Sequence, residues 1–315
     1  SDSSRLASGF KHLKFVPHFD YCNKQLLICC CLFFSLTGIS QIQTEDSLKN
    51  NISAAKNDNQ KITAFQEYAA YLVEQKTDDE KAFTFTNQSI SLAQKSGNYA
   101  AIAAAQLIIA DYYFFKSNWI KSIDAAQNAL LQSNKINNKE EKNNIEFKSY
   151  SSIAESYAYG GDFIPALENR LKALSAIENT PDHYAEKGEI YVSVINDFRH
   201  LKQNSKAIEY INKAASIFDN MNSETKLNYY YEYYQNLLFY NKVKEASKML
   251  EKFDAGLKQF PLSEQGRLDF TSMSYKLHGQ FEMSYTKDFN AALNNFKGYL
   301  KYSLITKDRV HTGIA

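Results

Sequence analysis

The residues able to carry out chemistry in this chain do not fall at the spacings that a known reaction requires. The histidines beyond residue 41 form no ligand pair at helical spacing, so they do not make a zinc site. No serine lies in a Gly-x-Ser-x-Gly elbow, and Gly160-Gly161 is typical of a turn between helices rather than of a phosphate-binding loop. We therefore expect no catalytic residue, no bound metal and no cofactor in this chain.

Two acidic pairs are also better explained by structure than by catalysis. Asp78-Asp79 and Glu140-Glu141 lie in polar stretches between apolar segments. Negative charge is favourable in the first turn of a helix. We therefore expect each pair to mark the start of a helix rather than an acid–base pair.

All four cysteines lie close to the N-terminus. They are Cys22, Cys29, Cys30 and Cys31, and three of them are adjacent within an apolar run. Adjacent cysteines lack the spacing of metal ligands, so they are interpreted as small apolar residues. No disulfide is expected in the rest of the chain.

The apolar run at residues 26–39 has the pattern of a secretory signal peptide. It follows Lys24 and ends near Gly38 and Ser40, small residues of the kind that precede a cleavage site. Because a membrane-spanning helix needs about 20 apolar residues, the run is short for an anchor. We expect residues 1–23 to be a disordered upstream extension, 24–40 a signal peptide or N-terminal apolar helix, and 41–315 the folded part.

The composition favours a folded helical protein. Of 315 residues, 44% are hydrophobic and 23% are charged, which is the range of folded chains rather than disordered ones. The 11 glycines and 4 prolines are few for an all-β architecture. A formal net charge of +1 gives no reason to expect nucleic acid as the partner.

A helix–turn–helix pattern recurs along the chain. The clearest unit, residues 152–174, has two apolar helical stretches on either side of Gly161-Asp162-Phe163. Successive units are spaced by 40, 44, 41, 39 and 46 residues, a mean of 42. The repeat is marked by a small residue early in each second helix: Ala82, Ser122, Ala166, Ala207, Ala246 and Ala292. One unit cannot bury its own apolar face, so six units must stack into a solenoid.

The unit resembles the tetratricopeptide repeat (TPR). The best match, residues 153–173, has Ile153-Ala154, Tyr157, Ala166 and Ala173 around the central turn, with Arg170 where the family has an aromatic residue. The usual TPR period is about 34 residues, so longer helices or connections are expected here. The resemblance implies an all-α fold, a TPR-like right-handed solenoid of about six repeats. A generic helical bundle is the structural alternative.

TPR proteins bind partners along a concave face lined by the first helix of each repeat, and this resemblance implies a binding groove. Projected onto this chain, the groove is mixed aromatic and polar, which suits an extended peptide or a helix. Its single basic member, Arg199, disfavours a clamp for a terminal carboxylate. The candidate groove residues are Tyr71, Asp111, Phe115, Glu155, Tyr159, Asn196, Arg199, His200, Tyr231, Gln235, Phe239, Phe281 and Tyr285.

The tyrosine run at 229–231 and 233–234 covers every face of a helix. We expect packing between repeats as its main role, and a contact surface for a partner is the alternative.

Residues 46–98 and 292–308 resemble the exported TPR sensor region of bacterial two-component histidine kinases. This resemblance implies a non-catalytic interaction and sensor region of an exported or membrane-bound signalling protein, on the periplasmic side of the inner membrane. The catalytic half would be absent from this chain, and the full-length protein would be a histidine kinase.

The partner implied by the resemblance is a protein or peptide, or a second copy of the chain. Membrane contact is expected only through the N-terminal segment or through a missing C-terminal helix. Two alternatives are a free-standing periplasmic TPR scaffold or assembly factor, and a cytoplasmic TPR protein whose residues 26–39 form a buried helix.

Overall fold

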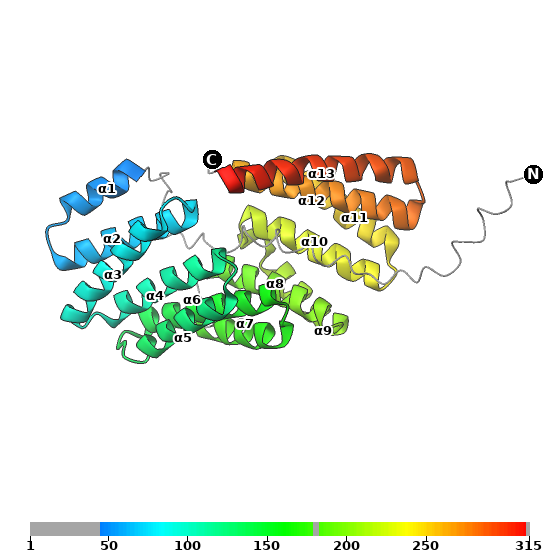
Figure 1. Cartoon of the computed structure of the whole chain (residues 1–315). Coiled ribbons are helices and arrows are strands. Elements are labelled where there is room, and N and C mark those ends of the chain that lie inside the picture. The colour runs from blue at the N-terminus through cyan, green and yellow to red at the C-terminus, as the bar shows by residue number, and fades with distance from the viewer. Residues whose placement is uncertain (1–44, 179–182, 313–315) are drawn as a thin grey trace, which may run out of the picture.

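The computed structural model describes residues 45–178 and 183–312, with side chains through residue 306. The expected upstream extension and signal segment therefore lie outside the described residues. Within them the chain forms thirteen α-helices and no strand (Figure 1). The helices are α1 (Glu45–Ala54), α2 (Asp58–Gln75), α3 (Asp79–Ser96), α4 (Tyr99–Phe115), α5 (Trp119–Ser133), α6 (Lys139–Gly160), α7 (Phe163–Ile177), α8 (Tyr184–His200), α9 (Asn204–Ser216), α10 (Ser223–Phe239), α11 (Val243–Gln259), α12 (Glu264–Phe281) and α13 (Phe289–Thr312). A short 3-10 turn, Phe218–Asn220, precedes α10, and a π-helical turn, Glu282–Thr286, follows α12. None of the described helices is both long and apolar enough to cross a membrane.

The helices pack as six successive antiparallel pairs. The pairs are α2/α3, α4/α5, α6/α7, α8/α9, α10/α11 and α12/α13, and α1 packs on α2. In each pair we call the earlier helix the first helix and the later one the second helix. The expected TPR-like solenoid of six repeats is confirmed.

The helix starts agree with the sequence. Asp78 caps α3 by accepting a hydrogen bond from the backbone N–H of Lys81 at 2.9 Å. Glu140 and Glu141 lie in the first turn of α6, so both acidic pairs begin helices as expected. Gly161 ends α6 with a φ of +87°, a left-handed conformation that glycine adopts without a steric penalty.

The small residue of each second helix is buried. The six expected positions are between 0% and 3% exposed. At Ser122 the reason is visible, because the hydroxyl of Ser156 on the next repeat's first helix donates to the Ser122 hydroxyl at 2.9 Å. A larger side chain there would hold the two helices apart.

Residues at one equivalent position of four successive first helices form hydrogen bonds with the repeat that precedes each of them. Polar contacts therefore tie four of the five junctions between repeats; three of these contacts are buried, and that of Tyr112 is partly exposed. They are Tyr112 to Asp79 at 3.3 Å, Ser156 to Ser122 at 2.9 Å, Arg170 to Asp197 at 2.7 Å, and Asn236 to the carbonyl of Asn204 at 3.3 Å.

Arg170, the departure from the TPR pattern, makes the buried ion pair of this series. Its side chain is 5% exposed and its Nε donates to Asp197 Oδ2, whose side chain is 0% exposed. Burial raises the pKa of Asp197 to about 6, although Arg170 acts to lower it. The arginine therefore replaces the aromatic residue of the family with an ion pair between α7 and α8.

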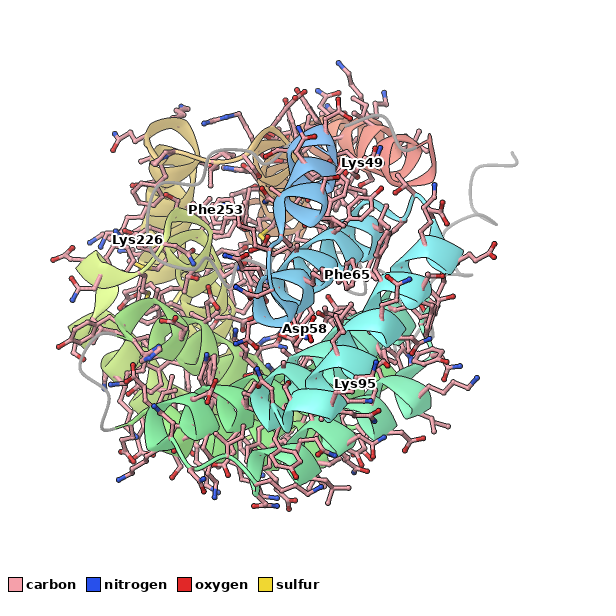
Figure 2. All side chains as sticks on the ribbon, turned by 90° about the vertical axis from the view of Figure 1, so that its left-hand side faces the viewer. Lys49, Asp58, Phe65, Lys95, Lys226 and Phe253 are labelled. Atoms are coloured by element: carbon pink, nitrogen blue, oxygen red, sulfur yellow. The ribbon has the colours of Figure 1, made fainter. Side chains whose placement is uncertain are left out.

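At three of the five junctions the first helices contact one another, whereas the second helices do not. Contacts join α2 to α4, α4 to α6 and α8 to α10, while pairs of second helices make no comparable contact in the described chain. The stack therefore curves, with α4, α6 and α8 on the inner side of the arc and α5, α7 and α9 outside (Figure 1). The C-terminal end of α13 points back toward α1–α3. Figure 2 views the chain from the α1 side, with fully buried Phe253 of α11 labelled.

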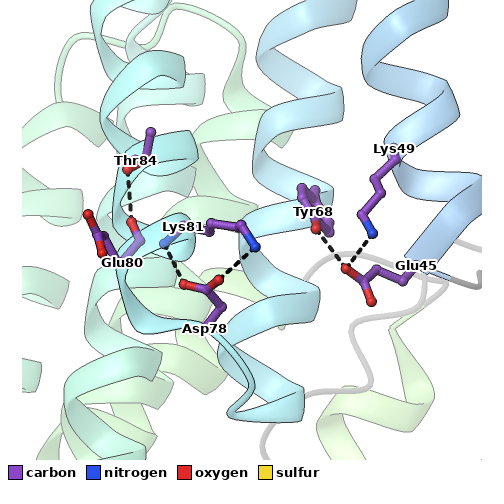
Figure 3. Close-up of polar contacts among 7 residues, drawn as sticks. All are labelled: Glu45, Lys49, Tyr68, Asp78, Glu80, Lys81 and Thr84. Carbon is purple, nitrogen blue, oxygen red and sulfur yellow. Dashed lines mark hydrogen bonds and ion pairs between the residues drawn. The ribbon is translucent and has the colours of Figure 1, made fainter.

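The helix α1 covers the N-terminal end of the stack. Leu48 of α1 is 2% exposed and packs in one cluster with Tyr68 and Leu72 of α2. The Tyr68 hydroxyl donates to Glu45 at 2.9 Å, and Lys49 pairs with the same carboxylate at 2.8 Å (Figure 3). A polar outer surface is what a terminal repeat needs in water.

We predict that Arg170→Ala lowers the free energy of unfolding by about 3–5 kcal/mol, because it leaves Asp197 buried without its cation. The loss should be smaller at pH 5 than at pH 8. Without Arg170 the folded-state pKa of Asp197 rises further above its unfolded value, so protonation relieves the cost at low pH. Urea unfolding followed by circular dichroism measures both effects. Lys172→Ala, at an exposed position of the same helix, is the control, and equal losses in the two variants would contradict the prediction.

Candidate functional site

The inner surface of the arc is the candidate site. It is formed by the first helices α4, α6, α8, α10 and α12, and we call it the inner face. Residues that lie seven or eleven positions apart on one helix point in nearly the same direction. Each helix can therefore present side chains to the inner face from several turns.

Acidic side chains follow one another across the inner face. We call the series the acidic row, and its members are Asp111 on α4, Glu155 on α6, Glu189 on α8, Glu224 on α10 and Asp269 on α12. Burial is the largest influence on the pKa values of Asp111, Glu189 and Glu224, and it raises all three. The charge of Glu155 raises the first two further, and that of Asp269 raises the third. Neighbouring repeats thus bring their carboxylates within electrostatic reach.

Glu189 lies at the centre of the acidic row. Burial, followed by the charges of Glu186, Glu155 and Glu224, raises its pKa to about 8, against a lowering by Asn222. The Asn222 side chain donates to Glu189 Oε1 at 2.7 Å. A carboxyl with this pKa is mostly protonated at pH 7 and ionises when a cation approaches.

Two basic side chains lie among these acids. Burial lowers the pKa of Lys148 on α6, whereas the charges of Asp111 and Glu186 act to raise it. Arg199 on α8 is bound within the fold: its Nε lies 3.1 Å from Glu232 and its Nη2 donates to Asn196 at 2.7 Å. Arg199 thus joins α8 to α10 and adds little free positive charge to the face.

The structure places the predicted groove residues in three different settings. Asp111 and Glu155 belong to the acidic row. Tyr159 and Asn196 are buried, at 7% and 8% exposure, so the expectation that they face a ligand is corrected. Tyr159 packs against Trp119 with ring centroids 5.6 Å apart, and Asn196 accepts the hydrogen bond from Arg199.

At two junctions the aromatic residue at the end of a first helix packs on the start of the preceding second helix. Tyr159 lies on Trp119, and the His200 ring stacks on Phe163 at 4.1 Å with an interplanar angle of 2°. At the next junction the corresponding residue is Asn204, which offers no ring, and Phe239 is left 60% exposed. His200 is therefore a packing residue, whereas Phe239 faces solvent.

The remaining candidates are half-buried or exposed. Tyr71 and Phe115 pack on the cluster that contains Leu48, and Gln235 is half-buried on α10. Tyr231 and Phe281 pack on the cluster around Phe253. Tyr285 is 37% exposed and its ring lies 5.4 Å from that of Phe281. Phe239 and Tyr285 are thus the accessible aromatic side chains of the predicted set.

The tyrosine run on α10 packs as expected. Tyr229 and Tyr234 are buried at 7% and 1% exposure. Tyr230, Tyr231 and Tyr233 are half-buried against the clusters on either side of α10. The run therefore fills the junctions between repeats.

Lys148, Glu189, Glu224 and Asp269 escaped the sequence analysis. The predicted groove residues lie near the end of each first helix, whereas these four lie nearer the helix starts. The residue spacing could have indicated two of them, Glu189 and Glu224. Glu189 precedes Asn196 by seven residues, and Glu224 precedes Gln235 by eleven, so each shares the face of a predicted residue.

One cluster contains serine, histidine and aspartate. The Ser274 hydroxyl donates to Asp254 Oδ1 at 2.7 Å, and His278 Nε2 lies 2.7 Å from Asp254 Oδ2. A nucleophilic serine must bond to the imidazole that takes its proton, and here it bonds to the carboxylate. The cluster ties α11 to α12. Among residues 45–178 and 183–312, no group of three or more histidine, cysteine or acidic side chains could hold a metal ion.

The solenoid is similar to solved structures at low sequence identity. BtubC (BKLC) from P. vanneervenii aligns with a TM-score of 0.55 and 16% identity, over 78% of this chain and 92% of its own. The apo form of RapI gives 0.57 and 11%, over 82% and 89%. A putative kinesin light chain with TPR-like repeats from Podosopora anserina gives 0.48 and 16%, over 64% and 97%. No family model matches the chain, and no curated protein matches its sequence. The first two structures share the helical-repeat fold of this chain.

We predict that the Asp254–His278 pair stabilises the fold at low pH more than at high pH. The hydrogen bond to Asp254 raises the pKa of His278 above its usual value. Its stabilisation is therefore complete below the unfolded-state pKa and is lost as pH rises through the folded-state pKa. His278→Asn should lower the free energy of unfolding by up to about 1 kcal/mol at pH 5.5, since the pair is partly exposed, and by less at pH 8.5. A loss that grows with pH would contradict this.

Proposed function

We propose that this chain is a non-catalytic protein-interaction module whose inner face binds an extended peptide or a helix bearing basic side chains. The observation that supports this proposal is the acidic row, which runs through five consecutive first helices. A solenoid of stacked repeats offers an extended concave surface of this kind. Phe239 and Tyr285, both exposed in the last two repeats, add aromatic contact area toward the ends of their helices.

The raised pKa values supply a reason for cationic ligands to bind. A carboxyl kept protonated by burial and by neighbouring acids gains a favourable interaction when a lysine or arginine arrives. Each unit by which the ligand lowers that pKa corresponds to about 1.4 kcal/mol. Binding should therefore release protons, and it should weaken as salt rises.

We predict that the whole chain binds a lysine-rich helical peptide more tightly than a glutamate-rich or an uncharged peptide of equal length, by fluorescence anisotropy. Replacing Asp111, Glu155 and Glu224 together by their amides should weaken that binding at least tenfold, because about half a kilocalorie or more is lost per contact. The matched control changes Asp124, Glu209 and Glu251, exposed acids of the second helices, and should have less than a threefold effect. Equal effects of the two triple variants, or a preference for the acidic peptide, would overturn the proposal.

We further propose that the chain is the sensor region of an exported, membrane-bound signalling protein of the histidine kinase type. The support is the resemblance of residues 46–98 and 292–308 to such regions and the signal-like pattern at 24–40. In this proposal, occupancy of the inner face alters repeat packing and is passed to the C-terminal helix. A free-standing periplasmic scaffold is the second candidate, favoured if inner-face variants leave phosphorylation of the intact protein unchanged.

Export has a direct test. We expect a periplasmic extract to contain protein that begins at Gln41, identified by N-terminal sequencing, as the signal-like pattern predicts. Protein found only in the cytoplasm with residues 26–39 retained would contradict export and leave the interaction proposal standing.

A further inference from the structure

The junctions between repeats differ in how closely their first helices approach. The first helices contact one another at α2–α4, α4–α6 and α8–α10, which we call the closed junctions. In the described chain, α6 with α8 and α10 with α12 make no comparable contact, and we call these the open junctions. At the α6–α8 junction a cavity of about 370 Å³ is lined by the first turns of α6, by Ile177 and by His183, just before α8. The helices α6 and α8 therefore have room to move closer.

Each closed junction has a hydrogen-bond donor or a cation that acts on the neighbouring first helix. At α2–α4, Gln66 donates to a backbone carbonyl of α4 at 2.7 Å. At α8–α10, Arg199 Nε lies 3.1 Å from Glu232. At α4–α6 the charges of Lys148 and Asp111 favour each other's ionised form, raising the pKa of the lysine and lowering that of the acid. These three junctions are held by attraction between first helices.

Acidic side chains act on one another across the open junctions. At α6–α8 the charge of Glu155 raises the pKa of Glu189, and at α10–α12 the charge of Asp269 raises that of Glu224, although burial is the larger influence on both. The largest charge effects on Glu189 come from Glu186 of α8, Glu155 of α6 and Glu224 of α10. All three are acids, so the charges around Glu189 disfavour its ionised form.

Lys148 and Glu189 occupy the same position of two successive repeats. Each lies eighteen residues before the small residue that marks its repeat. Their acidic neighbours on the preceding first helices are also equivalent, because Asp111 and Glu155 each lie eleven residues before the small residue of their own repeats. The same arrangement thus occurs twice with different charge. At the closed α4–α6 junction the acid meets a lysine, and at the open α6–α8 junction it meets a glutamate.

The charge of Lys148 is divided between its two neighbouring helices. Glu186 of α8 also acts to raise the pKa of Lys148, but less than Asp111 of α4 does. Asn222 donates to Glu189 at 2.7 Å, and this amide supplies no charge. The α6–α8 junction would therefore match the closed α4–α6 junction if a further cation reached Glu189.

We propose that the α6–α8 junction closes when a basic side chain of the ligand lies between Glu155 and Glu189, in the role that Lys148 has between α4 and α6. This inference rests on the proposed function for its ligand and adds the place at which that ligand changes the fold. The cation favours ionisation of Glu189, so that both carboxylates then attract it and draw the two helices together. Each repeat of a solenoid contacts only its neighbours, so closure at one junction reorients the repeats on either side of it.

Replacing Glu189 by lysine tests this closure without a ligand, because Glu189→Lys gives α6–α8 the charges of α4–α6. Spin labels at Lys139 and Tyr184, both exposed near the starts of α6 and α8, report their separation by double electron–electron resonance. The whole chain is used, with its four cysteines replaced by serine. We expect the mean distance to shorten by about 2 Å, the scale of helix shifts at packed interfaces. Glu209→Lys, at an exposed position of α9, is the matched control and should leave it unchanged.

An unchanged or longer distance in folded Glu189→Lys overturns the proposal. A second measurement places no new charge at the junction, in case that variant does not fold by circular dichroism. Raising the pH from 6 to 9 ionises Glu189 beside Glu155, Glu186 and Glu224, and should lengthen the same distance in the parent chain. Glu189→Gln should lose most of that change. A parent whose distance does not respond to pH would also overturn the proposal.

Addition of peptides separates this inference from the proposed function. A lysine-rich helical peptide should shorten the distance at pH 7, and a glutamate-rich peptide of equal length should not. If the lysine-rich peptide binds by fluorescence anisotropy and the distance stays the same, the proposed function stands and the closure is wrong. If it does not bind while Glu189→Lys shortens the distance, the proposed function is wrong and the response of the junction to charge is supported.

Discussion

The close approach of one repeat's first helix to the small residue of the preceding second helix is the contact on which the remaining structure depends. Ala166, Ala207 and Ala246 are completely buried there, and a side chain larger than alanine or serine would separate the helices. This approach can occur at five junctions, and the first helices contact one another at three of them, α2 with α4, α4 with α6 and α8 with α10, whereas the second helices of the described chain make no comparable contact. Curvature, inner face and outer face all follow from that difference.

The same approach explains the electrostatics of the inner face. Each first helix carries its own acidic residue, which in isolation would be an ordinary surface carboxylate. Stacking buries these acids, which is the largest cause of the raised pKa values of Asp111, Glu189 and Glu224, and it brings the charges of neighbouring acids within reach, which raises them further. Two other buried acids are paired instead: Asp197 forms an ion pair with Arg170, and Glu232 forms one with Arg199, in each case from a neighbouring helix. The fold neutralises the acids between helices with arginine, whereas those of the inner face crowd one another.

The repeat architecture could be predicted from the sequence because it depends on residue size and spacing, both of which are read directly. The positions of Ala82 through Ala292, the turn at Gly161 and the packing of the Tyr229–Tyr234 run were all confirmed. The surface roles of individual residues could not be predicted as well. Tyr159 and His200 became packing residues because of the rings at Trp119 and Phe163, a dependence between two repeats that one repeat's pattern does not contain. Glu189 was missed because its pKa depends first on burial and then on residues of α6, α8 and α10, which one repeat's pattern does not contain.

The central claim is that helix stacking buries and crowds carboxyl groups on the inner face, and the titration of Glu189 tests it most directly. Carbon-detected NMR of the chain with labelled glutamate, compared with Glu189→Gln, gives the midpoint for this one side chain. The account predicts a midpoint near pH 8, which falls when a lysine-rich peptide is added. A midpoint close to that of an unperturbed glutamate, near 4.3, would contradict it, because α6, α8 and α10 would then not hold their acids together.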